Sequence, residues 1–356
     1  RHLIDRETGA ARRTRVSEGK PMASRERPAR GYSRRFAWLA IAIVAVIGLY
    51  TAGWFYMASL LDAEAGKAIA RIERDGGVAL CANREARGYP FRIGVSCEAV
   101  TVDAPADEFR MNGGAFRSAA QLYRPNRLVT ELDGPVIIDA AAAPPLDLRW
   151  DLLQASVSAW TEGLDRFSVH VDRPSFATVA PAASRKPFFE AVSGEVHGRR
   201  RDNDLDLALR TMGGHLSRGS GADLPPFDVL ADITIDGAAD WLSGAAAGQS
   251  ARELFAGRSG TLRGLSLNLS DGGGETGVGE AGSGAGQNGG AELTGDFAFS
   301  EDGRLSGAFD LALSRPDDVA QSVSTAIPEL ADTARQIASV IPYLGRQDEA
   351  GRTVIR

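Results

Sequence analysis

The chain has 356 residues, and its 44% hydrophobic content excludes a globally disordered protein, while 41 glycines and 7% aromatic residues favour a β-rich fold over a helical bundle. Its net charge of −6 is unevenly spread: residues 1–35 carry 11 Lys and Arg against 4 Asp and Glu, residues 36–61 carry no charge, and the remainder holds −13. An acidic body repels phosphate backbones, which excludes nucleic acid as a partner.

The first predicted element is a membrane anchor. After the basic tail of residues 1–35, an uncharged run spans Phe36–Leu61, longer than the roughly 20 apolar residues that a helix needs to cross a membrane. Arg34 and Arg35 come directly before it, so the positive-inside rule keeps the tail in the cytoplasm and exports the body. A buried core helix and a cleavable signal peptide, whose apolar region is about 7–15 residues long, are the alternatives. Residues 1–21, which precede the first methionine, need not be native.

A helix is predicted to continue beyond the anchor, because apolar residues keep a helical spacing up to Gly76 and Gly77, which end it. The residues Phe91–Cys97 then alternate between apolar and polar, which predicts the first strand of the body. The alternation changes parity after this strand, so we expect a turn or bulge at Glu98 and Ala99.

Cys81 and Cys97 are the only two cysteines in the sequence. In an oxidising exported compartment two cysteines usually pair, and closing a loop of about 15 residues stabilises a fold by about 3 kcal/mol. A catalytic thiol would need a nearby base, yet the segment contains no histidine, and a metal site would need about four ligands. We therefore predict a structural disulfide that joins the end of the membrane-proximal helix to the first strand.

The body, residues 62–345, is dominated by runs in which apolar and polar residues alternate. This pattern predicts antiparallel strands with one apolar and one polar face. Glycines beside the strands indicate bends or bulges. The predicted fold class is mainly β, an α+β fold rich in strands, with one or more curved antiparallel sheets, an N-terminal transmembrane helix and C-terminal helices packed on the sheet. The clearest strand runs are residues 166–172, 204–210, 229–236, 261–270 and the hairpin 295–314.

Helical spacing is rarer in the body. Residues 250–257 predict a short helix capped by Ser250. Apolar residues at three- and four-residue steps between Val319 and Leu344 predict two helices separated near Pro328. We interpret this pair as packed on the sheet. The alternative is a membrane-surface or partner-binding helix, although its acidic polar face would not attract anionic lipid.

Two segments are predicted to lack a fixed fold. The Gly-rich run 271–290 cannot bury enough apolar surface to order itself, so it predicts a disordered loop between two strands. Residues 346–356 are expected to form a flexible C-terminal tail.

No catalytic, cofactor or metal motif emerges. Residues 277–282 match a dinucleotide fingerprint only formally, since they open no helix. His170 and His197 fall on the polar sides of predicted strands and are expected on the surface, and no nucleophile-elbow motif is present. One candidate contact for an anionic lipid headgroup or an acidic partner, against the simpler interpretation of a solvated hairpin loop, is formed by Arg199, Arg200 and Arg201.

An N-terminal anchor, the helix that leaves it, the run "C…GYPFRIGVSC" and a β-rich remainder with glycine-punctuated strands resemble the bacterial domain-of-unknown-function 2125 family. The resemblance covers most of Ala37–Leu344, and the "GYPFRI…C" run is its most specific part. It implies an uncharacterised envelope protein anchored in the bacterial inner membrane, with its body in the periplasm, and it supplies no catalytic residues. The strand style is also similar to AsmA-like envelope proteins, which are associated with lipid transport.

Three functions fit these observations. The first is a non-enzymatic anchored protein, without a cofactor, whose curved sheet binds a lipid or another apolar envelope component. The second is an interaction scaffold for an envelope membrane complex. The third is a hydrolase, which requires a histidine or paired carboxylates converging in a pocket. The sequence leaves open the ligand, the oligomeric state, and whether the apolar face of the sheet is an open groove or a closed core.

Overall fold

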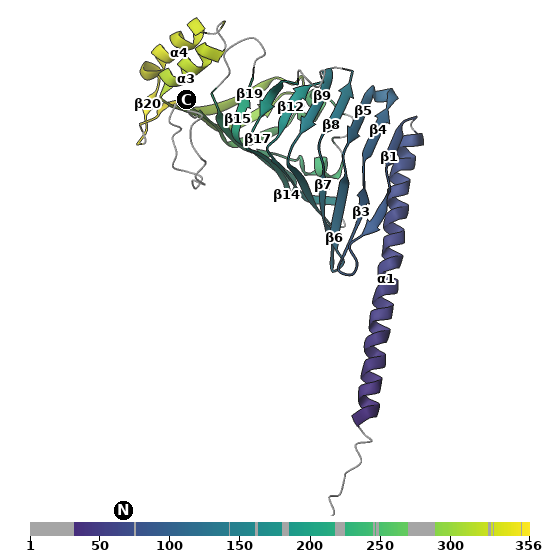
Figure 1. Cartoon of the computed structure of the whole chain (residues 1–356). Helices are drawn as coiled ribbons and strands as arrows, with labels where there is room; N and C mark the ends of the chain where they lie inside the picture. The colour runs from purple at the N-terminus through teal and green to yellow at the C-terminus, as the bar shows by residue number, and fades with distance from the viewer. Residues whose placement is uncertain are drawn as a thin grey trace, which may run out of the picture. The chain divides into compact units, whose positions relative to one another are not determined.

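The computed structural model is mainly β, as predicted (Figure 1). Helix α1 (Tyr32–Arg74) comes first, and the described residues then form 21 strands and several short helices. The chain divides into two units, residues 1–52 and 53–356, and the second holds every described strand. The described residues are 32–74, 76–141, 143–160, 163–179, 185–217, 225–244, 246, 249–269, 289–326, 329, 331–349 and 351–356.

Helix α1 contains both the predicted anchor and its predicted helical continuation, and it is long and apolar enough to cross a membrane. Every side chain from Arg34 to Tyr50 is exposed. Within the second unit, by contrast, Trp54 and Ala58 are buried against Ile93. The helix therefore combines a segment suited to lipid with a segment that packs on protein.

The strands form two antiparallel sheets. The first sheet holds, in spatial order, β1 (Val78–Cys81), β4 (Val100–Ala104), β5 (Phe109–Gly113), β8 (Val136–Ala140), β9 (Ala143–Arg149), β12 (Ser175–Thr178) and β13 (Pro187–Glu190). The second sheet holds, in spatial order, β2 (Glu85–Arg87), β3 (Arg92–Cys97), β6 (Phe116–Gln121), β7 (Arg124–Leu132), β10 (Leu152–Trp160), β11 (Gly163–Asp172), β14 (Ser193–Arg201), β15 (Asp204–Leu216), β16 (Phe227–Ile235), β17 (Ser259–Leu269), β18 (Gly290–Phe299), β19 (Leu305–Ser314), β21 (Thr353–Ile355) and β20 (Arg346–Gln347).

The chain crosses repeatedly between the two sheets. β3 leads to β4, β5 to β6, β7 to β8, β9 to β10, β11 to β12 and β13 to β14, each over a connection of two or three residues. Backbone hydrogen bonds also link neighbouring crossings: Gly114 N donates to Asp133 O at 3.2 Å, and Val192 N donates to Met212 O at 2.9 Å. In β15 the crossing lies inside one strand at Gly213, whose φ of +56° favours glycine. The sheets therefore meet along a hydrogen-bonded crease rather than as two separate layers.

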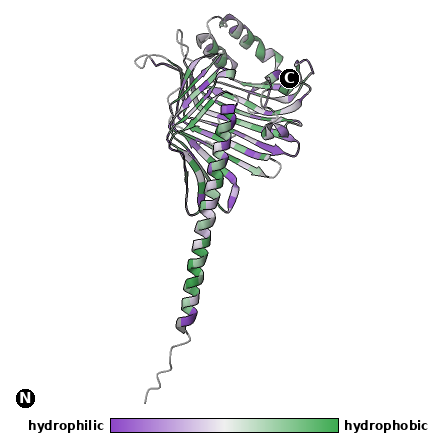
Figure 2. Ribbon diagram, turned by 90° about the vertical axis from the view of Figure 1, so that its right-hand side faces the viewer, coloured by the Kyte–Doolittle hydropathy of each residue, from purple (hydrophilic) through white to green (hydrophobic). Residues whose placement is uncertain are grey.

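One face of each sheet is apolar, as the alternation predicted, and the alternation is visible along the strands in Figure 2. A Cβ atom on Gly113 would lie 3.4 Å from Val136 of the first sheet and 3.5 Å from Leu132 of the second, so both apolar faces lie on one side of the crease. We call them together the inner face. Across the second sheet it follows directly paired residues, which are Ile93, Ala120, Leu128, Val157, Phe167, Gly198, Leu207, Ile233, Leu262, Gly295 and Phe309.

The positions of glycines within the strands have two structural explanations. The bulge between Asp232 and Ile233, where Gly264 is the opposing residue, fits the predicted bending. Gly198 instead makes room for an aromatic ring, because a Cβ atom there would lie 2.2 Å from the ring of Phe167 on the neighbouring strand. Glycines in these strands therefore mark two features: places where the strand pairing is irregular, and places where an aromatic ring from the neighbouring strand occupies the space of a side chain.

Short helices cover parts of the inner face. η3 (Ala239–Ser243) and α2 (Ala251–Phe255), the latter with the predicted Ser250 cap completed by Glu253, connect β16 to β17. Trp241 and Phe255 from these helices pack against Leu205 and Ile235. α3 (Pro316–Ala326) and α4 (Ala331–Leu344) lie against β19 and β21, which confirms the two C-terminal helices (Figure 1). A further short helix, η1 (Pro105–Asp107), connects β4 to β5.

Two expectations are corrected. The tail expected to be flexible forms β20 and β21, and Thr353 is buried where β21 pairs with β19. It adds a strand because β19 would otherwise present an unpaired edge.

The segment Phe91–Cys97, predicted as the first strand of the body, is not the first. The strands β1 and β2 precede it, it forms β3 from Arg92 onward, and Phe91 lies in the turn before β3. Residues 271–288 of the predicted Gly-rich loop, and Pro328, lie outside the described residues, whereas Gly290 begins β18.

Candidate functional site

The middle of the inner face leaves large apolar side chains partly exposed. Val196, Leu209, Ala231 and Leu265 form one row of directly paired residues across β14, β15, β16 and β17. The exposed fractions of the three large ones are 36%, 40% and 38%, and the adjacent Leu267 is 37% exposed. Residues in the centre of a sheet's apolar face are ordinarily packed against other elements. Here, among the described residues, they are not fully covered.

The two ends of the inner face are covered. At the first strands, Trp54 and Ala58 of α1 are buried with Ile93. At the last strands, α3 and α4 lie over β19 and β21, and together these elements line an open cavity of about 680 Å³. Its wall is almost entirely apolar and is made by Leu311, Leu313, Pro316, Val319, Ala320, Val323, Thr333, Ala334, Gln336, Ile337, Ala338, Val340, Ile341, Leu344 and Ile355. The inner face is therefore neither a closed core nor bare along its whole length. It holds a partly exposed apolar stretch between covered ends.

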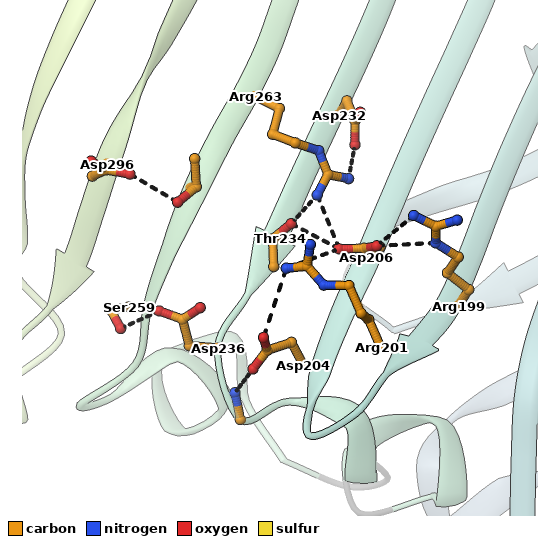
Figure 3. A network of polar contacts seen from close by, with 12 residues as sticks. Arg199, Arg201, Asp204, Asp206, Asp232, Thr234, Asp236, Ser259, Arg263 and Asp296 are labelled. Atoms are coloured by element: carbon orange, nitrogen blue, oxygen red, sulfur yellow. Dashed lines mark hydrogen bonds and ion pairs between the residues drawn. The ribbon is translucent and has the colours of Figure 1, made fainter.

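The outer face of the same strands is polar and extensively paired. Asp206 of β15 accepts hydrogen bonds from Arg199 on one side and from Thr234 and Arg263 on the other, at 2.8–3.1 Å (Figure 3). Its side chain is only 5% exposed, because these groups cover it. Burial raises the pKa of Asp206, but the hydrogen bonds from Thr234, Arg263 and Arg199 outweigh burial and lower the pKa to about 2.

This network gives a pH prediction. Because the pKa of Asp206 falls from 3.8 to about 2 on folding, its contribution is complete above about pH 4 and is lost as the pH falls through about 2. The contribution is on the order of 1–2 kcal/mol once the exposure of the arginines is considered. We expect Asp206→Asn to remove this part of the acid-induced loss of unfolding free energy. Acid titrations of thermal stability measure it, with Asp302→Asn in the exposed β18–β19 turn as control; parallel profiles for wild type and Asp206→Asn would contradict it.

The three arginines singled out in the sequence do not form one surface. Arg199 and Arg201 lie on the outer face, beside Asp206, and Arg201 is also 3.7 Å from Asp204. Arg200 lies on the opposite face, where its guanidinium donates to Ala239 O and Ser243 Oγ of η3. Successive strand residues point to opposite faces, so the triplet cannot bind one anion together.

His170 and His197, which are 27 residues apart in the sequence, lie on either side of the same carboxylate, that of Glu195. His197 Nδ1 lies 2.9 Å from Ser168 Oγ and its Nε2 lies 3.2 Å from Glu195, whose other carboxylate oxygen is 3.4 Å from His170. The hydrogen bond with His197 lowers the pKa of Glu195, and the nearby His170 lowers it further. Residues on paired strands produce this cluster, and no local motif in the sequence signals it.

A Ser–His–Glu chain is the arrangement of a hydrolytic site, but its surroundings here do not complete one. The side chains of His170 and His197 are 38% and 47% exposed on the outer face, as the polar positions predicted, and Ser168 and His197 line an open hollow of about 370 Å³. The backbone of β11 and β14 is paired on both sides, so its N–H groups are engaged in the sheet and do not converge as oxyanion donors. Within the described part of the chain, no group of three or more His, Cys, Asp or Glu side chains is arranged to hold a metal ion.

Cys81 and Cys97 lie at disulfide distance, with their Cα atoms 5.2 Å apart. Cys81 ends β1 in the first sheet and Cys97 ends β3 in the second. The pair spans the crease at the first crossing, where Ala82 N donates to Ala99 O. A bond between these residues would join the two sheets to each other, rather than a helix to a strand.

Comparison with known proteins gives one match. A protein-family model described as "Uncharacterized protein conserved in bacteria (DUF2125)" matches residues 54–356, nearly the whole of the second unit. No curated protein and no solved structure matches the chain. The resemblance inferred from the anchor, the "GYPFRI…C" run and the strand pattern is thereby confirmed.

Proposed function

Because the chain belongs to the DUF2125 family of bacterial proteins, whose description assigns no activity, we propose a function from its own geometry. The chain is a single-pass protein of the bacterial inner membrane, with a cytoplasmic N-terminus and a periplasmic body. The body holds the aliphatic chain of a lipid, or another apolar component of the envelope, on the inner face of its sheets. No catalytic step is part of this proposal.

The partly exposed row on the inner face carries the proposal. Val196, Leu209, Leu265 and Leu267 leave over a third of their surface uncovered in the centre of an apolar face. Full burial of an exposed side chain of this kind contributes about 1.5–3 kcal/mol, so covering the exposed third of each one contributes about 0.5–1 kcal/mol. A ligand that covers the whole row is therefore stabilised without any polar contact. An aliphatic chain fits this chemistry, since the row offers it neither charge nor hydrogen-bonding groups.

The charge distribution near the N-terminus supports the proposed orientation of the chain across the membrane. The basic tail of residues 1–35 and the uncharged segment 36–61 keep the positive end on the cytoplasmic side. The body then lies outside the cytoplasm, where a pair such as Cys81 and Cys97 is oxidised.

The scaffold function has a separate observation in its favour. On α4, the exposed fractions of Ile337, Val340 and Leu344 are 55%, 43% and 68%, which fits an apolar contact with another protein. These residues also line the cavity under the helices, so their apolar character is accounted for in part by the inner face itself. We therefore place lipid binding first.

Native mass spectrometry of the full chain in mild detergent tests the proposal. We expect lipid to stay bound to the wild-type chain, and Leu209→Glu to lower its affinity for lipid at least about tenfold, because a carboxylate would face the aliphatic chain. Leu230→Glu is the matched control, since Leu230 is 44% exposed, against 40% for Leu209, but lies on the outer face beside Arg210. Lipid that is absent from the wild type, or equally retained by both variants, would count against the inner face as the site.

A further inference from the structure

Aromatic side chains cluster around the buried Trp54, where α1 packs on the second sheet. Trp54 Nε1 donates to Arg92 O at 2.8 Å, and the rings of Trp54 and Tyr89 are 5.5 Å apart, edge to face. The β6–β7 turn joins the same place, because Leu122 N donates to Phe91 O at 3.0 Å. Three segments far apart in the sequence therefore meet at one end of the second sheet.

Large rings at this end remain exposed. Phe91 is 67% exposed and Tyr123 is 70% exposed, at the tips of the β2–β3 and β6–β7 turns. The set, which we call the aromatic rim, consists of Phe55, Tyr56, Tyr89, Phe91 and Tyr123. Aromatic rings at the ends of membrane helices prefer the boundary between headgroups and acyl chains. The rim has the composition of such a boundary.

Arginines lie beside the rim on the outer face. Arg92, Arg124 and Arg127 are exposed and line, with Arg117, a hollow of about 520 Å³. Arg117 is paired with Asp133 and Glu131, but in the part of the chain that the structure describes none of the other three has a carboxylate partner. This is a local positive surface on a part of the chain, residues 62–356, whose net charge is −13.

The position of the rim along α1 indicates what it faces. Trp54 and Ala58 belong to the uncharged run Phe36–Leu61, so the turns that contact them lie at the depth where that run leaves the membrane. At this depth, lipid headgroups offer the chemistry that aromatic rings and guanidinium groups bind. Each Arg near an anionic surface contributes about a fivefold gain in association, and three together contribute on the order of a hundredfold.

We propose that the aromatic rim and Arg92, Arg124 and Arg127 dock the body onto the phosphate headgroups of anionic phospholipids in the membrane that α1 crosses. The rings enter the headgroup boundary and the three guanidinium groups bind phosphate oxygens. This docking depends on the anchor and is independent of whether the inner face holds lipid. A failure of one proposal therefore leaves the other standing.

Hydrogen exchange of the full chain in nanodiscs tests the docking. We compare nanodiscs of phosphatidylcholine alone with nanodiscs of equal parts phosphatidylcholine and phosphatidylglycerol. In the mixed nanodiscs we expect the amides of residues 121–127 to exchange at least about fivefold more slowly, and the effect to weaken at high salt. Equal exchange in both compositions would overturn the proposal. So would equal protection by inorganic phosphate in detergent, which would assign the hollow to a free anion.

Matched variants assign the effect to these side chains. The triple variant Arg92→Gln, Arg124→Gln and Arg127→Gln should lose the slower exchange in mixed nanodiscs. The control triple removes the same charge from exposed arginines elsewhere, namely Arg210→Gln, Arg252→Gln and Arg346→Gln, and should keep it. Retention of the effect in the first triple, or its loss in both, would overturn the proposal, provided that near-ultraviolet circular dichroism shows both variants folded.

Discussion

Replacing Cys81 and Cys97 by serine is expected to lower the free energy of unfolding of the body by about 3 kcal/mol, because the denatured chain is no longer held in a closed loop of 15 residues. The structure adds a second reason to expect a large effect. The pair spans the crease between the two sheets and joins β1, the edge strand of the first sheet, to β3, which only the short β2 separates from the edge of the second sheet. For a body of this size the melting temperature should fall by roughly 5–10 °C.

Thermal unfolding of the full chain in detergent, followed by circular dichroism, measures this change. A reducing agent provides the control: it should lower the melting temperature of the wild type to that of the double serine variant and leave the variant unchanged. Equal stability of the oxidised wild type and the double variant would show that the cysteines contribute no covalent link.

Trp54→Ala is expected to destabilise the body by about 3–5 kcal/mol, the second large effect. Trp54 is 5% exposed and is buried among Ala58 and Ile93, so its removal leaves a cavity between α1 and the second sheet. The substitution also leaves the carbonyl of Arg92 without the indole N–H that donates to it.

Trp38 offers a matched control on the same helix, because it is an indole of the exposed, apolar segment with an exposed fraction of 72%. Trp38→Ala should leave the unfolding of the body unchanged under the same conditions. If both alanine variants melt like the wild type, the helix does not pack on the sheet as described, and the rim at its base loses its support.

The faces of the strands could be predicted from the sequence, but their partners could not. Phe167, Val169 and Val171 alternate with polar residues, and this is enough to place them on one apolar face. The alternation reports which side of a strand is apolar and is silent about which strand lies beside it. The two sheets arise because the chain bends at short connections such as Asp133–Pro135. Such a bend keeps the apolar side chains on the inner face, so the apolar–polar alternation in the sequence hardly changes where the chain passes from one sheet to the other.

The candidate sites were predictable to different degrees. The apolar residues of the inner face were visible as strand positions, but their partial exposure depends on what the helices leave uncovered. The arginines of the rim come from β3 and β7, which pairing through β6 brings to one face. The triplet at Arg199–Arg201 attracted notice because its members are adjacent in sequence, and that same adjacency sends them to opposite faces of β14.

The position of a bound lipid is the most direct test of the central claim. Cells grown with a photoreactive fatty acid supply labelled lipid, and irradiation of the purified full chain followed by peptide mapping shows which residues carry the adduct. We predict adducts on β14, β15 and β17 at the row of Val196, Leu209 and Leu265, in addition to those on the membrane helix. Adducts confined to Phe36–Leu61 would contradict a lipid site on the inner face.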